Sequence, residues 1–406
     1  TLRRVLSGTS SGLCLIAGWH STVASVVAWI AQVSIFRRTI PAANAGDLWL
    51  SCLLFWSCFL PLGAVWSLDA RRRPTGPRTV CGPATTGLVL QVMAVYLGAG
   101  LAKWNDSWFN GEAVRYALSV HDHGTALATW ITGTDWLVHL LSWGVVAFEI
   151  VTPLVFIAWP ASRLAIAVTF ILFHVTIWLT MSVGLFAPIG IVAWLPLLPA
   201  AAWERRPPGA EPTGIDCPSA AARWLCVAAM LLAAVSFVRD RTSWRERPLP
   251  VALQRAIHAV SMTQEWGMFG VVPPMEQWAY GRGLLADGRV VDPLRDGRPV
   301  AADRPAGGFT SLRHHRWHKL MWILPRPKVR PFAAHVAKAL ADEWNARHPA
   351  AERIVALEIR FAQRNAAEPE APVAEMLVGA WPDLDTAGTG NLDRFLEAVG
   401  TGRPPD

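Results

Sequence analysis

The residues most able to do chemistry in this sequence are a few ionisable side chains within apolar stretches. Lys103 follows the small residues Gly98, Ala99 and Gly100, and it is the only lysine before residue 319. Arginine supplies nearly all of the remaining positive charge. Both side chains can extend a charged head from an apolar segment to water, but only lysine readily loses its proton. The lysine at this position therefore favours a general base that removes a proton from a substrate.

Four other candidate side chains lie in or at the edge of apolar stretches or near Lys103. Asp47 begins one stretch. At ~1.5 Å per residue, His139 lies roughly 6 Å and His174 roughly 10 Å from the outer end of the stretch that contains it. Glu149 lies deeper, about 20 Å from the same end by the same rise. Ionisable residues at such depth usually face the interior of a helix bundle and are candidates for function.

We therefore predict one cavity that opens at the outward face of the membrane. Its expected catalytic residues are Lys103 and His174, and its expected pocket residues are Asp47, His139, Glu149 and Trp108. The alternative interpretation is structural. In that case Lys103 extends its amine to water, and His174 and Glu149 only make hydrogen bonds between helices.

Two histidine clusters could suggest a metal site. They consist of His121, Asp122 and His123, and of His314, His315 and His318. Neither has the HExxH pattern or a matched second pair of ligands, so we interpret both as solvated polar surface and expect no metal. The sequence also lacks a Walker A, GxSxG or dinucleotide-binding glycine motif, which argues against an ATPase or a lipase of the usual type.

The segments that hold these residues divide the chain into two unlike parts. Of the 406 residues, 52% are hydrophobic and 17% are charged. Residues 1–240 contain 26 charged residues and residues 241–406 contain 41, a density near the ~25% of soluble domains. We predict a transmembrane helical domain over 1–240 and a mixed α/β domain over 241–406. The net charge of +7 is spread over both parts, without the excess expected of a nucleic-acid-binding protein.

Seven apolar stretches in the first part are close to the ~20 residues that a helix needs to cross a bilayer. They occupy roughly residues 20–36, 48–65, 85–104, 136–159, 161–181, 184–203 and 222–238. The expected fold is therefore a polytopic α-helical membrane bundle with a span for each stretch, followed by a small α/β domain. The sequence opens on Thr1, and residues 5–17 read as the end of a helix, so we interpret the N-terminus as truncated.

Basic residues in the short connections predict which side of the membrane each connection faces. The loops at 66–84 and 204–221 and the turn at 159–163 contain seven arginines, against three in the connections on the opposite side. Because cytoplasmic loops carry an excess of Lys and Arg, we predict that the first set faces the cytoplasm. Residues 105–135 and everything after residue 239 then lie outside it. The expected location is the plasma (inner) membrane of a bacterial cell, with an extracytoplasmic C-terminal domain.

The C-terminal part has patterns of both strands and helices. Residues 277–285 and 289–292 flank Asp287-Gly288, a dipeptide typical of a two-residue hairpin turn. Residues 332–347 have helical periodicity, and residues 354–362 alternate as a half-buried strand does. No clear pattern marks residues 364–390, which we predict as weakly ordered.

Several short motifs make the first part resemble a known family. They are Ser34-Ile35-Phe36-Arg37-Arg38, Gly46-Asp47, Leu53-Leu54-Phe55-Trp56, Phe59-Leu60-Pro61-Leu62-Gly63, Trp66-Ser67-Leu68-Asp69, Gly100 with Lys103, Asp106-Ser107-Trp108 with Gly111, Glu149 with Pro153, and His174 with Gly184-Leu185-Phe186. On these motifs, residues from Gly18 to about 205 resemble the HTTM (horizontally transferred transmembrane) domain family, whose best-known relative is the vitamin K-dependent γ-glutamyl carboxylase. Trp266-Gly267-Met268-Phe269 with Pro273 and Pro274 resembles the start of the tail of bacterial members.

The resemblance implies a catalytic role for Lys103. In the carboxylase the corresponding lysine is the base that deprotonates vitamin K hydroquinone. Oxygen then converts the quinol into a stronger base, which removes a proton from glutamate before carbon dioxide adds. By resemblance, a quinol is the expected cofactor, and the lipid bilayer, a quinone lipid and a secreted peptide are the expected partners. The sequence departs from this pattern at Gly46-Asp47, where the carboxylase has a functional histidine, and its outward regions are shorter.

We therefore expect an integral membrane protein that uses Lys103 as a general base on a quinol-like or other lipid substrate, and that modifies a secreted peptide. The alternative is a non-enzymatic membrane partner in the export, maturation or immunity of a secreted peptide. A transporter is disfavoured, because no discontinuous inverted repeat is visible. An enzyme should bring Lys103, His174 and one carboxylate together around an apolar cavity, whereas in a scaffold Lys103 would point to bulk water.

Overall fold

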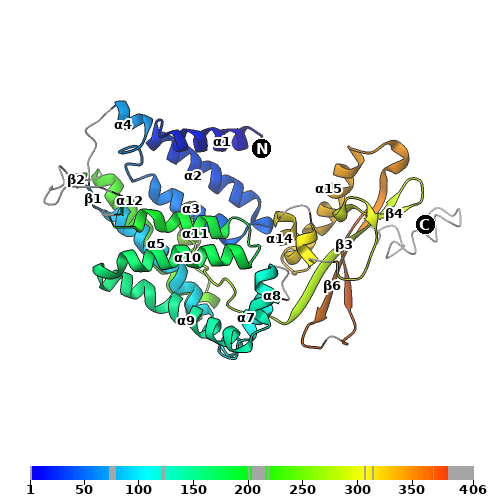
Figure 1. Ribbon diagram of the computed structural model, residues 1–406. Coiled ribbons are helices and arrows are strands. Elements are labelled where there is room, and N and C mark those ends of the chain that lie inside the picture. The colour runs from blue at the N-terminus through cyan, green and yellow to red at the C-terminus, as the bar shows by residue number, and fades with distance from the viewer. Residues whose placement is uncertain are drawn as a thin grey trace. The chain divides into compact units, whose positions relative to one another are not determined.

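The computed structural model describes residues 2–72, 79–119, 124–199, 202–203, 215–216, 219–305, 308–312, 315–368 and 370–382. Its contacts divide the chain into two compact units. Unit 1 consists of Thr1–Val114, Gly133–Leu179 and Val183–Val272, and unit 2 consists of Arg115–Thr132, Thr180–Ser182 and Pro273–Asp406. Figure 1 shows the helices of unit 1 and the sheet of unit 2, and each unit is considered by itself below.

Unit 1 is almost entirely helical. Its helices are α1 (Leu2–Ala17), α2 (Ser21–Arg38), α3 (Ala45–Ser57), α4 (Leu68–Arg72), α5 (Pro83–Ala102), α6 (Asp106–Phe109), α9 (Asp135–Ala158), α10 (Arg163–Thr180), α11 (Phe186–Trp194), α12 (Ala220–Arg241) and α13 (Val251–Ala259). The strands β1 (Thr79–Val80) and β2 (Ile215–Asp216) form a short parallel pair.

Four helical segments of the described residues are long and apolar enough to cross a membrane. They are Pro83–Ala102, Asp135–Ala158, Pro160–Thr180 and Ala220–Arg241. Each exceeds or matches the ~20 residues that span the hydrocarbon core of a bilayer. The chain is therefore a mostly helical, multi-pass integral membrane protein with a C-terminal domain of different construction.

The other three predicted spans form helices that are shorter or more polar. The stretch at 48–65 forms α3, which ends at Ser57 and is followed by turns around Pro61. The stretch at 184–203 forms α11 and the 3-10 helix Leu195–Leu197, where Pro196 supplies no backbone N–H to an α-helix. The stretch at 20–36 forms α2, which carries several Ser and Thr side chains and a Gln. Seven spans therefore stay a prediction, of which four have the length and composition required.

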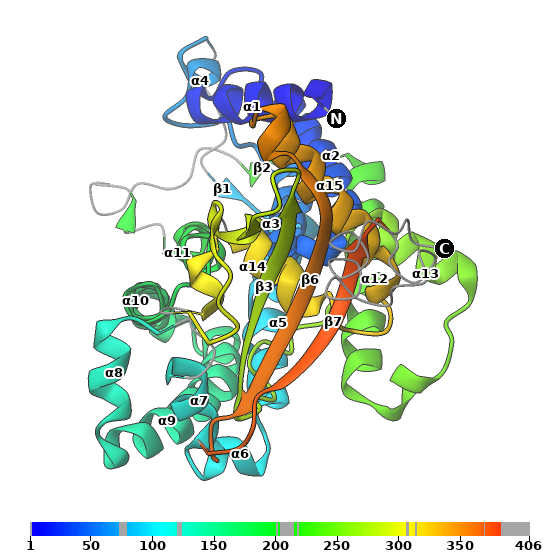
Figure 2. The same cartoon turned by 90° about the vertical axis from the view of Figure 1, so that its right-hand side faces the viewer.

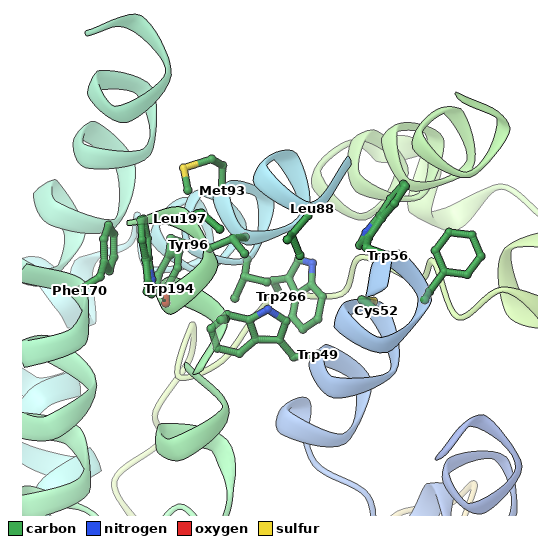
Figure 3. Close-up of a cluster of buried hydrophobic side chains, with 14 of the residues drawn as sticks. Trp49, Cys52, Trp56, Leu88, Met93, Tyr96, Phe170, Trp194, Leu197 and Trp266 are labelled. Atoms are coloured by element: carbon green, nitrogen blue, oxygen red, sulfur yellow. Dashed lines mark hydrogen bonds between the residues drawn. The ribbon is translucent and has the colours of Figure 1, made fainter. Parts of the chain in front are cut away.

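The core of unit 1 surrounds α5 with large aromatic side chains. Trp49 and Trp56 of α3, Trp194 of α11 and Trp266 are fully buried. Figure 3 shows Tyr96 of α5 beside Trp194, with Trp49 and Trp266 nearby. Aromatic side chains of this size bury more apolar area than any other residue type, so a small number of them packs the helices against one another. Gly87 admits the Trp56 ring, which would lie 2.3 Å from an added Cβ atom.

Unit 1 extends beyond the predicted boundary at residue 240, up to Val272. Gln264 exchanges two hydrogen bonds with Gln91 of α5, at 3.0 and 3.1 Å. Its backbone N–H donates to Ser236 Oγ of α12 at 2.9 Å, and Trp266 Nε1 donates to Gln264 Oε1 at 2.6 Å. Buried amides require such partners, so this network holds the segment after α13 within the helical unit.

Unit 2 is built on a five-stranded antiparallel sheet with the strand order β5-β4-β3-β6-β7. Its elements are α7 (Glu112–Ser119, which begins in unit 1), α8 (Ala126–Thr132), β3 (Met275–Leu285), β4 (Val290–Asp292), β5 (Arg298–Pro299), α14 (His315–Ile323), α15 (Ala333–Asn345), β6 (Ile354–Asn365) and β7 (Ala374–Trp381). Figure 2 shows β3, β6 and β7 side by side with α15. Leu340 of α15 packs with Leu357 and Ile359 of β6 in the core of this unit.

The expected hairpin, helix and strand of the C-terminal part are confirmed. β3 and β4 pair on either side of a turn that contains Gly288, whose φ of +87° lies in the left-handed region that glycine adopts readily. The helix expected over 332–347 is α15, and the strand expected over 354–362 is β6. The prediction that 364–390 is weakly ordered is wrong for β7, which pairs with β6 at the sheet edge. Val378 is the one buried residue of β7, so this strand does not need the strict alternation of apolar and polar residues that marks a half-buried strand.

Candidate functional site

Lys103 and Glu149 form a buried ion pair. Lys103 Nζ lies 2.7 Å from Glu149 Oε2, and the two side chains are only 5% and 7% exposed. Nζ also donates to the carbonyl oxygen of Ala99, at 3.4 Å. Lys103 caps the C-terminal end of α5, and Glu149 lies in the middle of α9. The structure thus brings together two of the residues that we predicted for one cavity, and Lys103 does not point to bulk water.

The small residues before Lys103 explain how Glu149 reaches it. A Cβ atom on Gly100 would lie 2.8 Å from Ile150 Cγ1 and 3.0 Å from Glu149 Cβ, so α9 packs directly on the α5 backbone at this point. On another side of α5, a Cβ atom on Gly98 would lie 2.9 Å from Trp266 Cβ. Gly100 therefore lets α9 with the Glu149 carboxylate approach one side of the end of α5, and Gly98 lets Trp266 approach another.

A second segment is fastened to the same end of α5. Trp108 of α6 is buried, and its ring centroid lies 5.3 Å from Lys103 Nζ, within cation–π distance. Trp108 Nε1 donates to the carbonyl of Phe269 at 2.8 Å, and Asn105 Nδ2 donates to the carbonyl of Gly270 at 2.8 Å. Phe269 has a φ of +55°, a backbone conformation that is costly for an aromatic residue. The hydrogen bonds from Trp108 and Asn105 to this segment hold it in that conformation.

His174 belongs to a different polar group. Its Nε2 atom lies 2.7 Å from the Tyr96 hydroxyl, which also accepts a 2.7 Å hydrogen bond from Trp194 Nε1. Because the hydroxyl has one proton, it can accept from Trp194 and donate to His174. His174 is 0% exposed, and within the described residues its Nδ1 atom has no hydrogen-bond partner. A Cβ atom on Gly190 would lie 2.2 Å from the imidazole, so α11 can approach His174 only with glycine there.

The two polar groups share one face of α5. Tyr96 precedes Lys103 by seven residues, which is two helical turns and about 10 Å along the axis. No hydrogen bond or ion pair links His174 to Lys103 or Glu149 in the part of the chain that the structure describes. The predicted cluster is thus divided: Lys103, Glu149 and Trp108 lie together, and His174 lies with Tyr96.

The remaining two predicted pocket residues lie elsewhere in unit 1. Asp47 forms a capping box at the start of α3, where its carboxylate accepts from the Asn44 backbone at 2.9 Å and its backbone N–H donates to Asn44 Oδ1 at 3.1 Å. This role explains an acidic residue at the third position of a helix. His139 is exposed and lies near Gly111, and the described residues include no hydrogen-bond or ion-pair partner of its side chain.

The histidine clusters give no metal site that the structure can describe. His121, Asp122, His123 and His314 lie outside the described residues. The rings of His315 and His318 are 5.6 Å apart on α14. Among the described residues there is no group of three or more His, Cys, Asp or Glu side chains that could hold a metal ion.

Sequence reasoning missed Tyr96, Trp194 and the glycines that admit Glu149 and His174. A usable signal existed for Tyr96, because it is one of three tyrosines in the chain and lies at helical spacing from Lys103. Asn44 three residues before Asp47 was likewise a readable capping signal. The close approaches at Gly100 and Gly190 depend on which helix faces meet, and one sequence does not show this.

Chemically, the arrangement holds a primary amine and a carboxylate in contact, away from water, at the end of a helix. A family model, the HTTM domain, matches residues 10–203. Searches of curated proteins and of solved structures gave no match. The matched region contains α2 to α11 with Lys103, Trp108, Glu149 and His174. The chain therefore contains an HTTM domain over this part of its sequence, as its motifs predicted.

Proposed function

We propose that this protein is a membrane enzyme that removes a proton from a hydrophobic substrate with a weakly acidic hydroxyl group, such as a quinol, with Lys103 as the general base. The observation that carries the proposal is the contact of 2.7 Å between Lys103 Nζ and Glu149 Oε2, with both side chains buried. Burial makes charged groups costly, which favours the neutral amine with the neutral carboxylic acid relative to the ion pair. The two states differ only in the position of one proton and have the same net charge.

The proton transfer balances within the pair. When the pair's proton lies on Glu149, the Nζ atom of Lys103 has a free lone pair. The substrate O–H bond then breaks, its proton binds Nζ, and its electron pair stays on the substrate oxygen. The resulting ammonium group of Lys103 faces the substrate anion and stabilises this anion by its charge and by a hydrogen bond. An arginine cannot take this role, because its guanidinium does not give up a proton in proteins.

The surroundings of the pair support a planar, hydrophobic substrate that arrives from the lipid. Trp104 follows Lys103 and is 66% exposed, and its ring packs edge-on against Phe109 at 5.3 Å. Phe109 in turn stacks on the exposed Trp143 at 4.6 Å. Aromatic side chains of this kind concentrate at membrane–water interfaces. We further propose that this end of α5 faces outward and that a secreted peptide is the second substrate, by resemblance to the carboxylase.

The substitution Lys103→Arg tests the proposal, because it keeps the positive charge and removes the base. The purified protein would be reconstituted in lipid nanodiscs with a long-chain naphthohydroquinone, and oxygen uptake would follow formation of the quinol anion. We expect the rate of Lys103→Arg to fall by about 100-fold or more, the usual contribution of a general base. Lys338→Arg in unit 2 makes the same chemical change away from the site and should leave the rate unaltered. A wild-type rate in Lys103→Arg would refute the role of Lys103.

The same variants separate the enzyme from a non-enzymatic membrane partner in export, maturation or immunity of a peptide. The double variant Lys103→Met with Glu149→Leu replaces the pair with apolar side chains of similar volume, which often leaves a fold intact. Retention of cellular function in this variant would indicate a scaffold. Mass spectrometry of lipids and peptides that co-purify with the wild-type protein would then identify its partner.

A further inference from the structure

Unit 2 contains a long segment without acidic residues. Between Asp303 and Asp342 there are eight Lys and Arg residues and four histidines, but no Asp or Glu. Three of the four lysines of the chain lie there: Lys319, Lys328 and Lys338. This segment includes α14, the first part of α15 up to Ala341, and the turn between the two helices. A run of one charge on a folded domain produces a positive potential that attracts anions.

Within this segment two cations contact one indole ring. Lys319 Nζ lies 4.3 Å from the centroid of Trp322, and the guanidinium carbon of Arg326 lies 4.4 Å from the same centroid. Both distances are within the range of a cation–π contact. Two positive groups around one ring repel each other, so the arrangement gains from an added negative charge.

The part of the chain that the structure describes does not supply that negative charge. Among the residues that the structure describes, no carboxylate forms a hydrogen bond or an ion pair with Lys319 or Arg326. In contrast, Lys338 of α15 pairs with Asp342 at 2.6 Å. Burial, with a smaller effect from Arg326, lowers the pKa of Lys319 to about 8. Lys319 is thus partly desolvated, and no described carboxylate compensates its charge.

Hydrogen bonds hold the Trp322 ring and the backbone of Arg326 in place. Trp322 Nε1 donates to Gln277 Oε1 of β3 at 2.8 Å, which fixes the ring against the sheet. Arg326 lies between Pro325 and Pro327. Its backbone N–H donates to the carbonyl of Ile323 at 3.0 Å, and its carbonyl accepts from Arg330 at 2.9 Å. A site fixed before binding loses little conformational entropy when a ligand arrives.

We propose that Lys319, Trp322 and Arg326 form a binding site for a phosphate-bearing anion. Lysine and arginine are the usual phosphate-binding side chains, and a phosphate group offers two cations more oxygen acceptors than a carboxylate does, with one negative charge in a diester and close to two in a monoester. The phosphate can belong to a lipid headgroup or to a soluble molecule. The site is independent of the chemistry proposed for Lys103.

Protection of Lys319 from acetylation by a water-soluble succinimidyl ester tests the site in the full-length protein in a neutral detergent. With only four lysines, each labelled peptide is assigned directly by mass spectrometry. Inorganic phosphate at matched ionic strength should slow Lys319 acetylation by about fivefold, because a bound anion occupies the amine. Acetate at the same concentration should slow it less than phosphate. Lys338 is the internal control and should label at a constant rate.

The variant Arg326→Gln removes the second cation at an exposed position and should abolish the protection of Lys319, with Lys338 labelling unchanged as evidence that the domain is folded. Short-chain phosphatidylglycerol and phosphatidylcholine then distinguish the two sources. Protection by phosphatidylglycerol alone supports a lipid headgroup, and protection by inorganic phosphate supports recognition of the phosphate group itself. Equal Lys319 rates in phosphate, phosphatidylglycerol and chloride would overturn the proposal, as would equal protection by acetate.

Discussion

At the scale of single residues, the pairing of Lys103 with Glu149 decides what this site can do. The rarity of lysine singled out Lys103, and the depth of Glu149 in an apolar stretch singled out the carboxylate. Their contact at 2.7 Å gives the carboxylate a role that depth alone did not predict. A buried charge without a partner is far more costly than a buried pair, so each of these residues requires the other.

Glu149→Gln removes the negative charge with almost no change in volume, and it leaves Lys103 without a counter-charge. We expect the free energy of unfolding to fall by about 3–5 kcal/mol, the usual cost of breaking a buried pair. Thermal unfolding in detergent at constant pH would measure the change. Asp342→Asn breaks the exposed pair with Lys338 and serves as the control, with an expected loss below about 1 kcal/mol. If Glu149→Gln were as stable as the control, the buried pair would not contribute as the structure implies.

Residue types and spacing predicted the members of the site better than they predicted its connections. Lys103, Glu149 and Trp108 were all candidates, and they lie together. His174 was expected beside Lys103, but its partner is Tyr96. The reason is that a sequence gives the depth of a side chain along its helix, while the direction in which it points depends on packing. Gly100 and Gly190 control that packing, and a glycine has no side chain whose pattern could reveal it.

At the scale of elements, α5 organises unit 1, and the connections between helices fix their ends. The clearest case is α2, whose N-cap residue His20 has a φ of +47° and makes no capping hydrogen bond with its side chain. Asp69, at the start of α4, accepts from the backbone N–H groups of His20 and Ser21 at 3.0 and 2.8 Å. It also accepts from Ser21 Oγ at 2.9 Å. A carboxylate distant in sequence thus caps the helix and complements its dipole.

This cap predicts a pH dependence of stability. Hydrogen bonds from the Ser21 backbone and hydroxyl lower the pKa of Asp69 below its usual value, with a smaller contribution from His20. A carboxyl group with a lowered pKa in the folded state stabilises the fold above its unfolded pKa, and this contribution disappears as the pH falls through the folded value. The difference in melting temperature between wild type and Asp69→Asn should therefore shrink as the pH falls from about 5 to about 2. A difference that stays constant over this range would contradict the capping role of the ionised group.

The elements of unit 2 were easier to predict than the spans of unit 1. The Asp287-Gly288 turn and the periodicities of α15 and β6 are local signals, and each gave the observed element. For α3 and α11, apolar composition indicated long spans, but proline residues shorten the helices. The sequence of β7 has no strong alternation of apolar and polar residues. The strand forms through its backbone hydrogen bonds with β6, which do not require such a pattern at a sheet edge.

At the scale of the whole molecule, the distribution of arginines among the connections predicts one topology across the membrane. The positive-inside rule predicts that the start of α5 faces the cytoplasm and that Lys103 and the domain after Val272 face outward. Cys81 lies two residues before α5, is exposed and is a free thiol. The sequence after residue 240 contains no cysteine, so a thiol introduced there is unique to that side. Ala286 in the β3–β4 turn is exposed and small, which makes it suitable for this purpose.

Labelling of intact cells with a membrane-impermeant maleimide tests this topology in Ala286→Cys. We expect the thiol introduced at position 286 to be modified and Cys81 to stay unmodified, because charged reagents do not cross the bilayer. After cell lysis both thiols should react, which shows that Cys81 is accessible once the membrane is open. Mass spectrometry of the two peptides distinguishes the positions. Modification of Cys81 with protection of position 286 in intact cells would reverse the topology, and the Lys103 pair would then face the cytoplasm, where a secreted peptide could not reach it after export.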